Sequence, residues 1–188
     1  LQIFETVEFS FDTLAQRLRE LAFLNGGVTI TIDDERDGGK SHKFLYEGGI
    51  KSFVSYLNQN KAVVNDKPIH MHGEKDGIDV EIALQWNDGY TETVYTFANN
   101  INTHEGGTHL AGFRGALTRG LNVYAVAAGL IKEGEGFEGE DCREGLAAVI
   151  ACKIPDPQFE GQTKMKLGNS EIKGLVESLL YEKLLVYF

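Results

Sequence analysis

The sequence is poor in cysteine, with only two in 188 residues. Cys142 and Cys152 form no CxxC pair, so a disulfide framework is excluded and we expect two reduced thiols. No apolar run approaches the roughly 20 residues that a membrane helix needs, and no basic-then-apolar leader opens the chain. These absences predict a cytoplasmic protein that neither spans nor binds a membrane.

The short motifs of several common active sites are absent as well. We find no GxxxxGK[ST] motif, no GxGxxG after a predicted strand and no GxSxG, which excludes a complete nucleotide site of those types and a serine nucleophile elbow. His70 and His72 share one face of a predicted strand without a further ligand cluster, so we predict no metal site. His104 and His109 flank a predicted helix start and are expected to cap it or to form hydrogen bonds.

Negative charge dominates the composition, with a formal net charge of −10, which argues against a general nucleic-acid coat. Two windows, residues 106–132 and 161–168, nevertheless contain no Asp or Glu. Their basic residues are Arg114, Arg119, Lys132, Lys164 and Lys166. At 100° per residue, Arg114 lies about 60° from the apolar stripe of its predicted helix and can project into a groove. Arg119 points away from the stripe and is expected to be solvated.

Hydrophobic periodicity predicts two groups of elements. The first 46 residues are interpreted as a helix beginning after Asp12 and two strands, residues 28–34 and 42–47. A helix in residues 47–60 follows. The strands 69–74, 78–86 and 90–97 are then expected to form an antiparallel meander, because Asn87-Asp88-Gly89 is a strong hairpin signal.

In the rest of the chain, the pattern predicts a helix capped by Thr108 and an exposed glycine-rich loop at 133–141. Residues 145–157 are almost wholly apolar, which predicts a strand in a central position of the sheet. A last helix opens at Asn169 or Ser170. Together the patterns predict an α/β two-layer sandwich, with helices on one face of a mixed sheet.

A loop of unusual chemistry, FEGQTKMKLGN, occupies residues 159–169. Gln162 offers an amide N–H, Thr163 a hydroxyl, and Lys164 a compact ammonium that suits a terminal phosphate. A solvated loop would carry the same residues, so spacing alone leaves both interpretations open.

Four long blocks make the chain resemble a known family. RLRELAFLNGGVTITIDDER, YEGGIKSFVSYLN, IALQWNDGYTETVYTFANNINTHEGGTHLAGFRGALTR and GEDCREGLAAVIACKIPDPQFEGQTKMKLGNSE are similar, in this order, to the ATPase component of bacterial type IIA DNA topoisomerases, which is either DNA gyrase B or the corresponding part of topoisomerase IV. The resemblance implies that residues 1–46 are the last elements of a GHKL-type ATP-binding domain. Residues 47–188 would be the transducer domain, with a ribosomal protein S-five domain 2-like fold that contains a left-handed β-α-β crossover.

The same resemblance implies the site residues. Gln162 and Lys164 would contact the γ-phosphate of ATP held by the ATP-binding domain of the same polypeptide, with Lys164 also catalytic, and Arg114 would line a cavity for double-stranded DNA. ATP and Mg²⁺ are expected in the full-length protein, and neither is expected to bind this chain. The implied partners are a second copy of the same protein, DNA gyrase A and double-stranded DNA.

Alternatives remain at this stage. An ATP-independent nucleic-acid-binding scaffold would share the sandwich, and a mismatch-repair or chaperone ATPase would share the QTK tripeptide. LQWNDGY and EGGTHLAGFRGALTR favour the topoisomerase family over that second alternative. The apolar residues at both ends predict that the chain is a fragment, inactive in isolation. GGTHLAGFRGALTR favours DNA gyrase B, with topoisomerase IV as the alternative.

Overall fold

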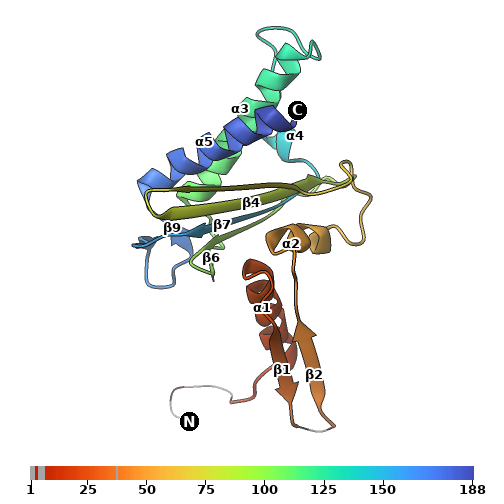
Figure 1. Ribbon diagram of the computed structural model, residues 1–188, viewed down its shortest axis with the longest axis vertical. Coiled ribbons are helices and arrows are strands. Elements are labelled where there is room, and N and C mark those ends of the chain that lie inside the picture. The colour runs from red at the N-terminus through yellow and green to blue at the C-terminus, as the bar shows by residue number, and fades with distance from the viewer. Residues whose placement is uncertain (1–2, 4–6, 37) are drawn as a thin grey trace. The chain divides into compact units, whose positions relative to one another are not determined.

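A computed structural model describes residue 3, residues 7–36 and residues 38–188 (Figure 1). The chain divides into two compact units, Leu1–Phe53 and Val54–Phe188. The helix α2, Ile50–Leu57, contains the point of division. Each unit is described below by itself.

The first unit contains the predicted helix and two strands. Helix α1 is Phe11–Leu24, and strands β1 (Ile30–Asp34) and β2 (Lys40–Phe44) pair antiparallel. The helix begins earlier than predicted, because the Ser10 hydroxyl, not Asp12, caps it by accepting a hydrogen bond from the Thr13 N–H at 3.3 Å. Phe44 is buried between the helix and the strands, so this unit has its own small core.

The second unit is built on a five-stranded mixed sheet with the order β3-β4-β7-β5-β6. Its strands are β3 (Ile69–Lys75), β4 (Ile78–Trp86), β5 (Thr93–Ala98), β6 (Ile101–Asn102) and β7 (Leu146–Lys153). Strand β7 runs antiparallel to β4 and parallel to β5. Its central position, predicted from the apolar run, is confirmed, since its first five residues are buried.

The predicted meander is confirmed for β3 and β4, which pair antiparallel, but it is wrong for β5, which does not return along β4. At Asn87 the chain turns away from β4. The Asn87 N–H donates to the Gly145 carbonyl at 2.9 Å, and its Oδ1 accepts from the Gly89 N–H. Strand β7 then occupies the place beside β4. A long apolar strand gains more by lying between two neighbours than a local hairpin gains from its turn.

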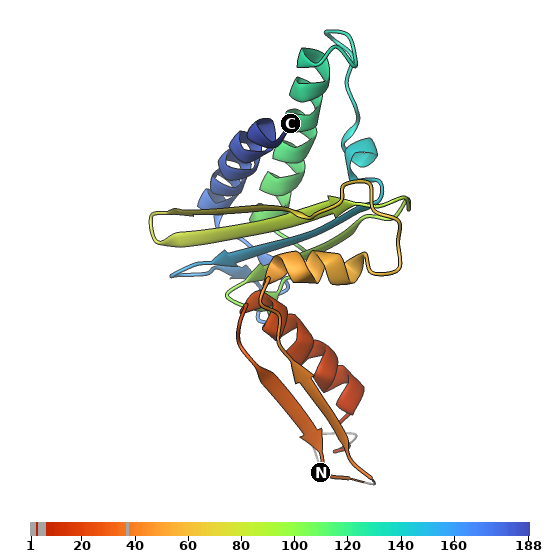
Figure 2. The same cartoon turned by 45° about the vertical axis from the view of Figure 1, so that its right-hand side comes forward.

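Two long helices, α3 (Thr108–Ala127) and α5 (Ser170–Tyr187), pack side by side on one face of this sheet (Figures 1 and 2). Small residues let them approach closely. A Cβ at Gly112 would lie 2.4 Å from the Lys173 carbonyl oxygen, and one at Gly120 would lie 2.9 Å from Leu184. The core between helices and sheet contains side chains from both helices and from β3, β4, β5 and β7.

The predicted glycine-rich loop ends sooner than expected. A short helix, α4 (Gly139–Arg143), begins inside it, with a capping box in which the Glu138 N–H donates to Asp141 Oδ2 at 2.8 Å. The loop before it remains largely exposed, as predicted.

Both cysteines are free and buried, which confirms the prediction of reduced thiols. Burial raises the pKa of the Cys152 thiol to about 12, so this thiol is unreactive. Among the described residues, no helix combines the length and apolar character that crossing a bilayer requires.

His70, His72 and His109 form ordinary structural contacts. His104 is exposed and forms no hydrogen bond with the described residues, so its predicted role as a cap or hydrogen-bonding residue is wrong. On the surface of β3, His70 lies 2.7 Å from Glu81 and His72 lies 2.6 Å from Asp79. His109 is fully buried and bonded through Nε2 to the Thr103 hydroxyl at 2.9 Å, which confirms its predicted hydrogen-bonding role. Burial lowers the pKa of His109 to about 4. Within the residues that the structure describes, no group of three or more His, Cys, Asp and Glu is placed to bind a metal.

Candidate functional site

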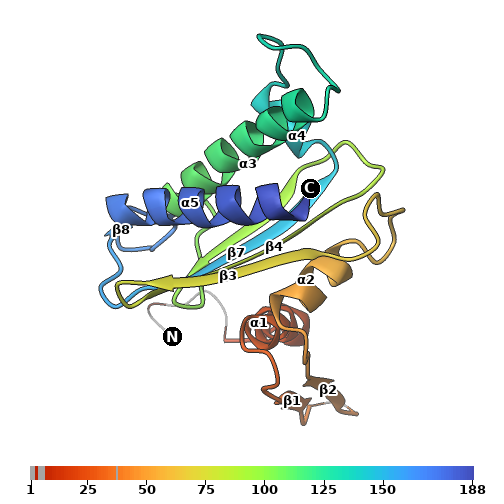
Figure 3. The same cartoon turned by 45° about the horizontal axis from the view of Figure 1, so that its top comes forward.

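The loop singled out from the sequence is the tip of a β-hairpin. Strands β8 (Phe159–Glu160) and β9 (Lys166–Leu167) pair antiparallel between β7 and α5 (Figure 3). Residues 161–164 at the tip are exposed. Gly161, at φ +80°, opens the turn, and its carbonyl accepts the Lys164 N–H at 3.3 Å. The chemistry noted in the sequence is therefore presented on a short, defined support.

The two lysines of the hairpin are held differently. Lys166 forms an ion pair with Glu160 on the facing strand, with Nζ 3.1 Å from Oε2. Lys164 has a left-handed backbone, φ +56°, and its ammonium lies 5.9 Å from the centre of the Phe159 ring. This backbone region is uncommon for residues other than glycine and costs of order 1 kcal/mol or more. Lys166 belongs to the support, whereas Lys164 belongs to the exposed tip with Gln162.

One side chain closes the base of the hairpin. Asn169 is 3% exposed, and its Oδ1 accepts the Gln158 N–H at 2.6 Å while its Nδ2 donates to the Asp156 carbonyl at 3.1 Å. The same Nδ2 donates to Glu171 Oε1 at 2.9 Å, which lowers the pKa of that carboxyl. Asn169 is the N-cap of α5, as predicted, but its side chain forms no capping hydrogen bond with a backbone N–H of the helix.

The hairpin is also joined to the start of α3. The Glu105 N–H donates to the Met165 carbonyl at 2.9 Å, and the Leu167 N–H donates to the Gly106 carbonyl at 3.0 Å. Gly107 forms a parallel bridge with Leu167 and has φ +134°. A Cβ there would lie 2.2 Å from the Leu167 carbonyl oxygen. Glycine alone fits this conformation and contact, so hairpin and helix form one hydrogen-bonded body.

This contact also corrects the predicted cap of α3. The N-cap is Gly107, and Thr108 is the first helical residue. The Thr108 hydroxyl oxygen is buried and forms no hydrogen bond with the described residues. The close approach of Leu167 to the backbone decides which residue precedes the helix, and a threonine would not fit at that position.

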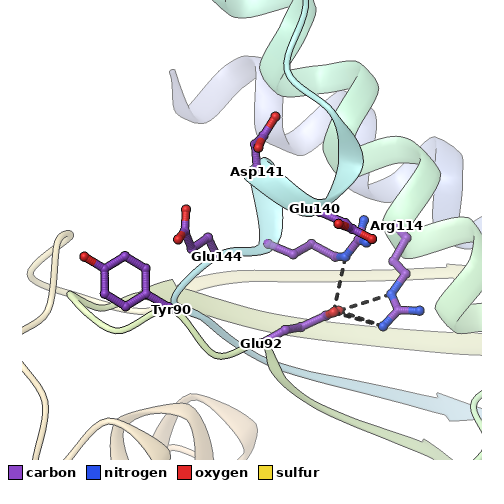
Figure 4. Close-up of a pocket in the computed structure, with 7 residues that line it drawn as sticks. Tyr90, Glu92, Arg114, Glu140, Asp141 and Glu144 are labelled. Carbon is purple, nitrogen blue, oxygen red and sulfur yellow. Dashed lines mark hydrogen bonds and ion pairs between the residues drawn. The ribbon is translucent and has the colours of Figure 1, made fainter.

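Arg114, the basic residue placed beside the apolar stripe, lines a pocket of about 540 Å³ (Figure 4). The pocket is lined by Tyr90, Glu92, Arg114, Glu140, Asp141, Arg143 and Glu144. Its projection into a hollow agrees with the position predicted on the helix. Four carboxylates face two guanidinium groups, so the lining is net acidic.

Glu92, which directly precedes β5, binds both arginines of this pocket. Arg114 Nη2 lies 2.9 and 3.0 Å from its two carboxylate oxygens, and Nε lies 3.1 Å from Oε1. Arg143 Nε lies 3.3 Å from Oε2. Glu92 was not predicted from the sequence, since no local signal links it to Arg114 at a separation of 22 residues.

Arg114 also borders a second hollow, of about 430 Å³, between the start of α3 and the hairpin. Its charged lining residues are Glu105, Arg114, Glu160, Lys166 and Lys173. Here three cations face two carboxylates, so the sign of the lining is opposite to that of the first pocket.

Arg119 is exposed, as predicted, but its guanidinium group also contacts the neighbouring helix. Its guanidinium carbon lies 4.4 Å from the centre of the Tyr181 ring on α5. A guanidinium group stacks on an aromatic face through the ring quadrupole, so Arg119 contributes to the contact between the two helices.

Comparison with known proteins gives the same assignment along most of the chain. The family model described as DNA gyrase B matches residues 49–188. The DNA gyrase B protein of Myxococcus xanthus is 60% identical over 183 residues, which are 97% of this chain and 22% of that protein. The gyrase B protein of Clostridium acetobutylicum is 57% identical over 188 residues, 99% of this chain and 29% of that protein. The chain thus spans less than a third of each relative.

Solved structures agree. The 43K ATPase domain of Thermus thermophilus gyrase B, solved in complex with an aminocoumarin, is 39% identical with a TM-score of 0.83, over 99% of this chain and 50% of that one. The B-subunit of the DNA gyrase from Myxococcus xanthus gives a TM-score of 0.86 at 26% identity, over 99% of this chain and 52% of that one. With a mixed α/β fold, four matching sequence blocks and a family model that covers most of its length, the chain belongs to the DNA gyrase B family.

Proposed function

We propose that this chain is the transducer part of an ATP-dependent type IIA DNA topoisomerase of the gyrase type. Residues 1–46 would complete its ATP-binding domain, and residues 47–188 would form a transducer with the ribosomal protein S-five domain 2-like fold. The longer cytoplasmic protein would bind ATP and Mg²⁺ and hydrolyse ATP. Its partners would be a second copy of itself, DNA gyrase A and double-stranded DNA.

The hairpin tip is the observation that carries this proposal. Gln162 and Lys164 are exposed on a support that Asn169 closes and that is hydrogen-bonded to the start of α3. An amide N–H and an ammonium on such a tip suit the γ-phosphate of ATP bound in the neighbouring domain. Lys164 would stabilise the charge that develops during phosphoryl transfer, as its catalytic role.

The mechanism is a two-state coupling. With ATP bound, Gln162 and Lys164 gain a phosphate partner, which favours the orientation of the transducer in the closed dimer. Loss of phosphate after hydrolysis removes that contact and releases the orientation. A coupling of about 1–3 kcal/mol is typical of allosteric systems. Because the hairpin is bonded to α3, the change would reach Arg114, which we propose to contact DNA phosphates without reading sequence.

Substitution of Lys164 tests the proposal in the longer protein that contains this chain. Lys164→Ala should lower the ATPase rate by about 10²–10³, the usual effect of removing one group that stabilises a transition-state charge, and should abolish supercoiling. Lys166→Ala is the matched control: it removes a cation already paired with Glu160 in the same hairpin and should change the rate by less than about twofold. Wild-type ATPase and supercoiling in Lys164→Ala would refute the role of the tip.

An ATP-independent nucleic-acid-binding scaffold is the second candidate, favoured by the basic lining near Lys166 and Lys173. It predicts salt-dependent DNA binding that ATP analogues do not alter. Measurement of DNA binding by the longer protein, with and without a non-hydrolysable ATP analogue, separates the two functions. Relatives named as DNA gyrase support gyrase over topoisomerase IV, and ATP-dependent introduction of negative supercoils would distinguish them.

A further inference from the structure

We infer that Glu92 is an internal competitor for DNA at Arg114: while its carboxylate neutralises the guanidinium, a DNA phosphate binds Arg114 less tightly than it would after displacing that carboxylate. This inference rests on the proposed contact between Arg114 and DNA and assigns a regulatory partner to it. The Glu92 carboxylate occupies the edge of the guanidinium formed by Nε and Nη2 and neutralises its charge. It therefore weakens the attraction of Arg114 for a phosphate, which a guanidinium binds through the same kind of bidentate contact.

The geometry of the pair supports this competition. Three contacts of 2.9–3.1 Å join the guanidinium of Arg114 to both oxygens of Glu92. Arg143 holds the same carboxylate from the other side, with Nε 3.3 Å from Oε2. Figure 4 shows the carboxylate of Glu92 directed at Arg114. Arg143 thus holds the Glu92 carboxylate in place, and the carboxylate keeps this partner when Arg114 moves to a phosphate.

Exposure makes the exchange feasible. The side chain of Arg114 is 43% exposed and that of Glu92 is 25% exposed. A partly exposed ion pair contributes little net stability, because water solvates both charges well when they separate. Arg114 can therefore exchange partners at low cost. A fully buried pair would not, since breaking it would leave a desolvated charge.

The surroundings define the direction of the exchange. On the side of Glu92, the pocket carries four carboxylates, which repel a phosphate backbone. Arg114 also borders the hollow that contains Lys166 and Lys173, whose lining, apart from Arg114 itself, has as many lysines as carboxylates. DNA phosphates are expected on the side of this hollow, where Lys173 would add a second contact. Arg114 lies at the boundary between the two environments.

The consequence is that Arg114 binds DNA weakly and reversibly. The energy gained from each phosphate contact is reduced by the ion pair that the contact replaces, and Glu92 recaptures Arg114 when the duplex leaves. Such a balance suits a duplex that must enter and then leave, because a strongly bound duplex would not be released.

The experiment is a double-mutant cycle in this 188-residue chain. DNA binding is measured by fluorescence anisotropy of a short labelled duplex of mixed sequence, across a salt series beginning at low ionic strength. Glu92→Gln keeps the shape of the side chain but removes its charge and one of its two acceptor oxygens. Glu140→Gln is the matched control, since it removes the same charge from the same pocket without a bond to Arg114. Far-UV circular dichroism checks the fold of each variant.

We expect Glu92→Gln to strengthen DNA binding about two- to fivefold, corresponding to the release of one exposed ion pair. Its log-log salt slope should become steeper by about one phosphate contact. Glu140→Gln should leave the slope unchanged. Arg114→Gln should weaken binding more in the Glu92→Gln background than in the wild-type background, by the same two- to fivefold factor.

Each other outcome overturns a defined part of the proposal. Equal effects of Glu92→Gln and Glu140→Gln, or equal losses on Arg114→Gln in both backgrounds, overturn the competition while leaving the DNA contact in place. No effect of Arg114→Gln in either background, or no DNA binding by any variant at low salt, overturns the DNA contact itself. The role of Lys164 in ATP hydrolysis is measured separately and is not affected by these results.

Discussion

The bridge between Gly107 and Leu167 predicts that Gly107→Ala uncouples the hairpin from α3. A Cβ there would lie 2.2, 2.6 and 2.9 Å from the carbonyl oxygen, nitrogen and carbonyl carbon of Leu167. All three are backbone atoms, so no side chain can rotate away. The alanine must also adopt φ +134°, which L-residues rarely populate.

The magnitude follows from these contacts. Backbone strain costs about 1–3 kcal/mol, displacement of the neighbouring backbone about 1–3 kcal/mol, and loss of the bond from the Leu167 N–H to the Gly106 carbonyl about 1 kcal/mol. The lower entropy of the unfolded alanine chain offsets about 0.7 kcal/mol. From these terms, Gly107→Ala should lower the free energy of unfolding by about 4 kcal/mol.

Denaturant unfolding followed by tryptophan fluorescence measures this change in the unit Val54–Phe188, which contains Gly107. The chain has one tryptophan, Trp86, which lies in β4 and donates its indole N–H to the Cys142 carbonyl at 3.1 Å. The control is Gly174→Ala on α5, where a Cβ meets open space, and it should stabilise the unit by about 0.5–1 kcal/mol through helix propensity. A loss below about 1 kcal/mol in Gly107→Ala would show that the hairpin and α3 are not rigidly joined.

Two further predictions concern the helix layer and its buried histidine. Gly112→Ala should lower the free energy of unfolding by about 1–3 kcal/mol, because its Cβ would lie 2.4 Å from the Lys173 carbonyl oxygen. Gly115→Ala should raise it by about 0.5–1 kcal/mol, because its Cβ would lie 3.4 Å from the Glu177 carboxylate, which is the end of a flexible side chain. Equal effects of the two substitutions in urea unfolding would contradict the close approach of α3 and α5. His109, with its pKa lowered from 6.5 to about 4 by burial, binds its proton in the unfolded chain first, so stability should fall by up to about 3 kcal/mol as pH decreases from 6.5 to 4. His109→Gln should flatten this part of a stability-against-pH curve, and an unchanged slope would exclude the histidine as its source.

The parts of the fold that the sequence predicts well are those decided by burial. The apolar run of β7 predicts a strand with neighbours on both sides, and the structure has it between β4 and β5. The turn at Asn87 was interpreted wrongly, because a local turn signal contains no information on a strand almost 60 residues later in the chain. The bond from Asn87 to Gly145 is non-local and could not be read from either residue.

The candidate site divides in the same way. Gln162, Lys164 and Arg114 carry a chemistry that the sequence displays, and the resemblance to a family assigned them roles that remain proposals. Glu92 and Asn169 were not assigned to the site, since acidic and amide residues occur throughout the chain and only the folded backbone brings these two to Arg114 and to the hairpin base. Partners of long side chains depend on tertiary geometry and leave no periodic trace in a sequence.

The amide of Asn169, where the chain leaves the hairpin, forms hydrogen bonds with Asp156 and Gln158, where the chain enters it. The exposed tip, residues 161–164, can change length at an entropic cost that grows only with the logarithm of the number of residues. The sandwich beneath would keep its fold. The tip can therefore be redesigned to bind a different ligand without a change in the rest of the fold.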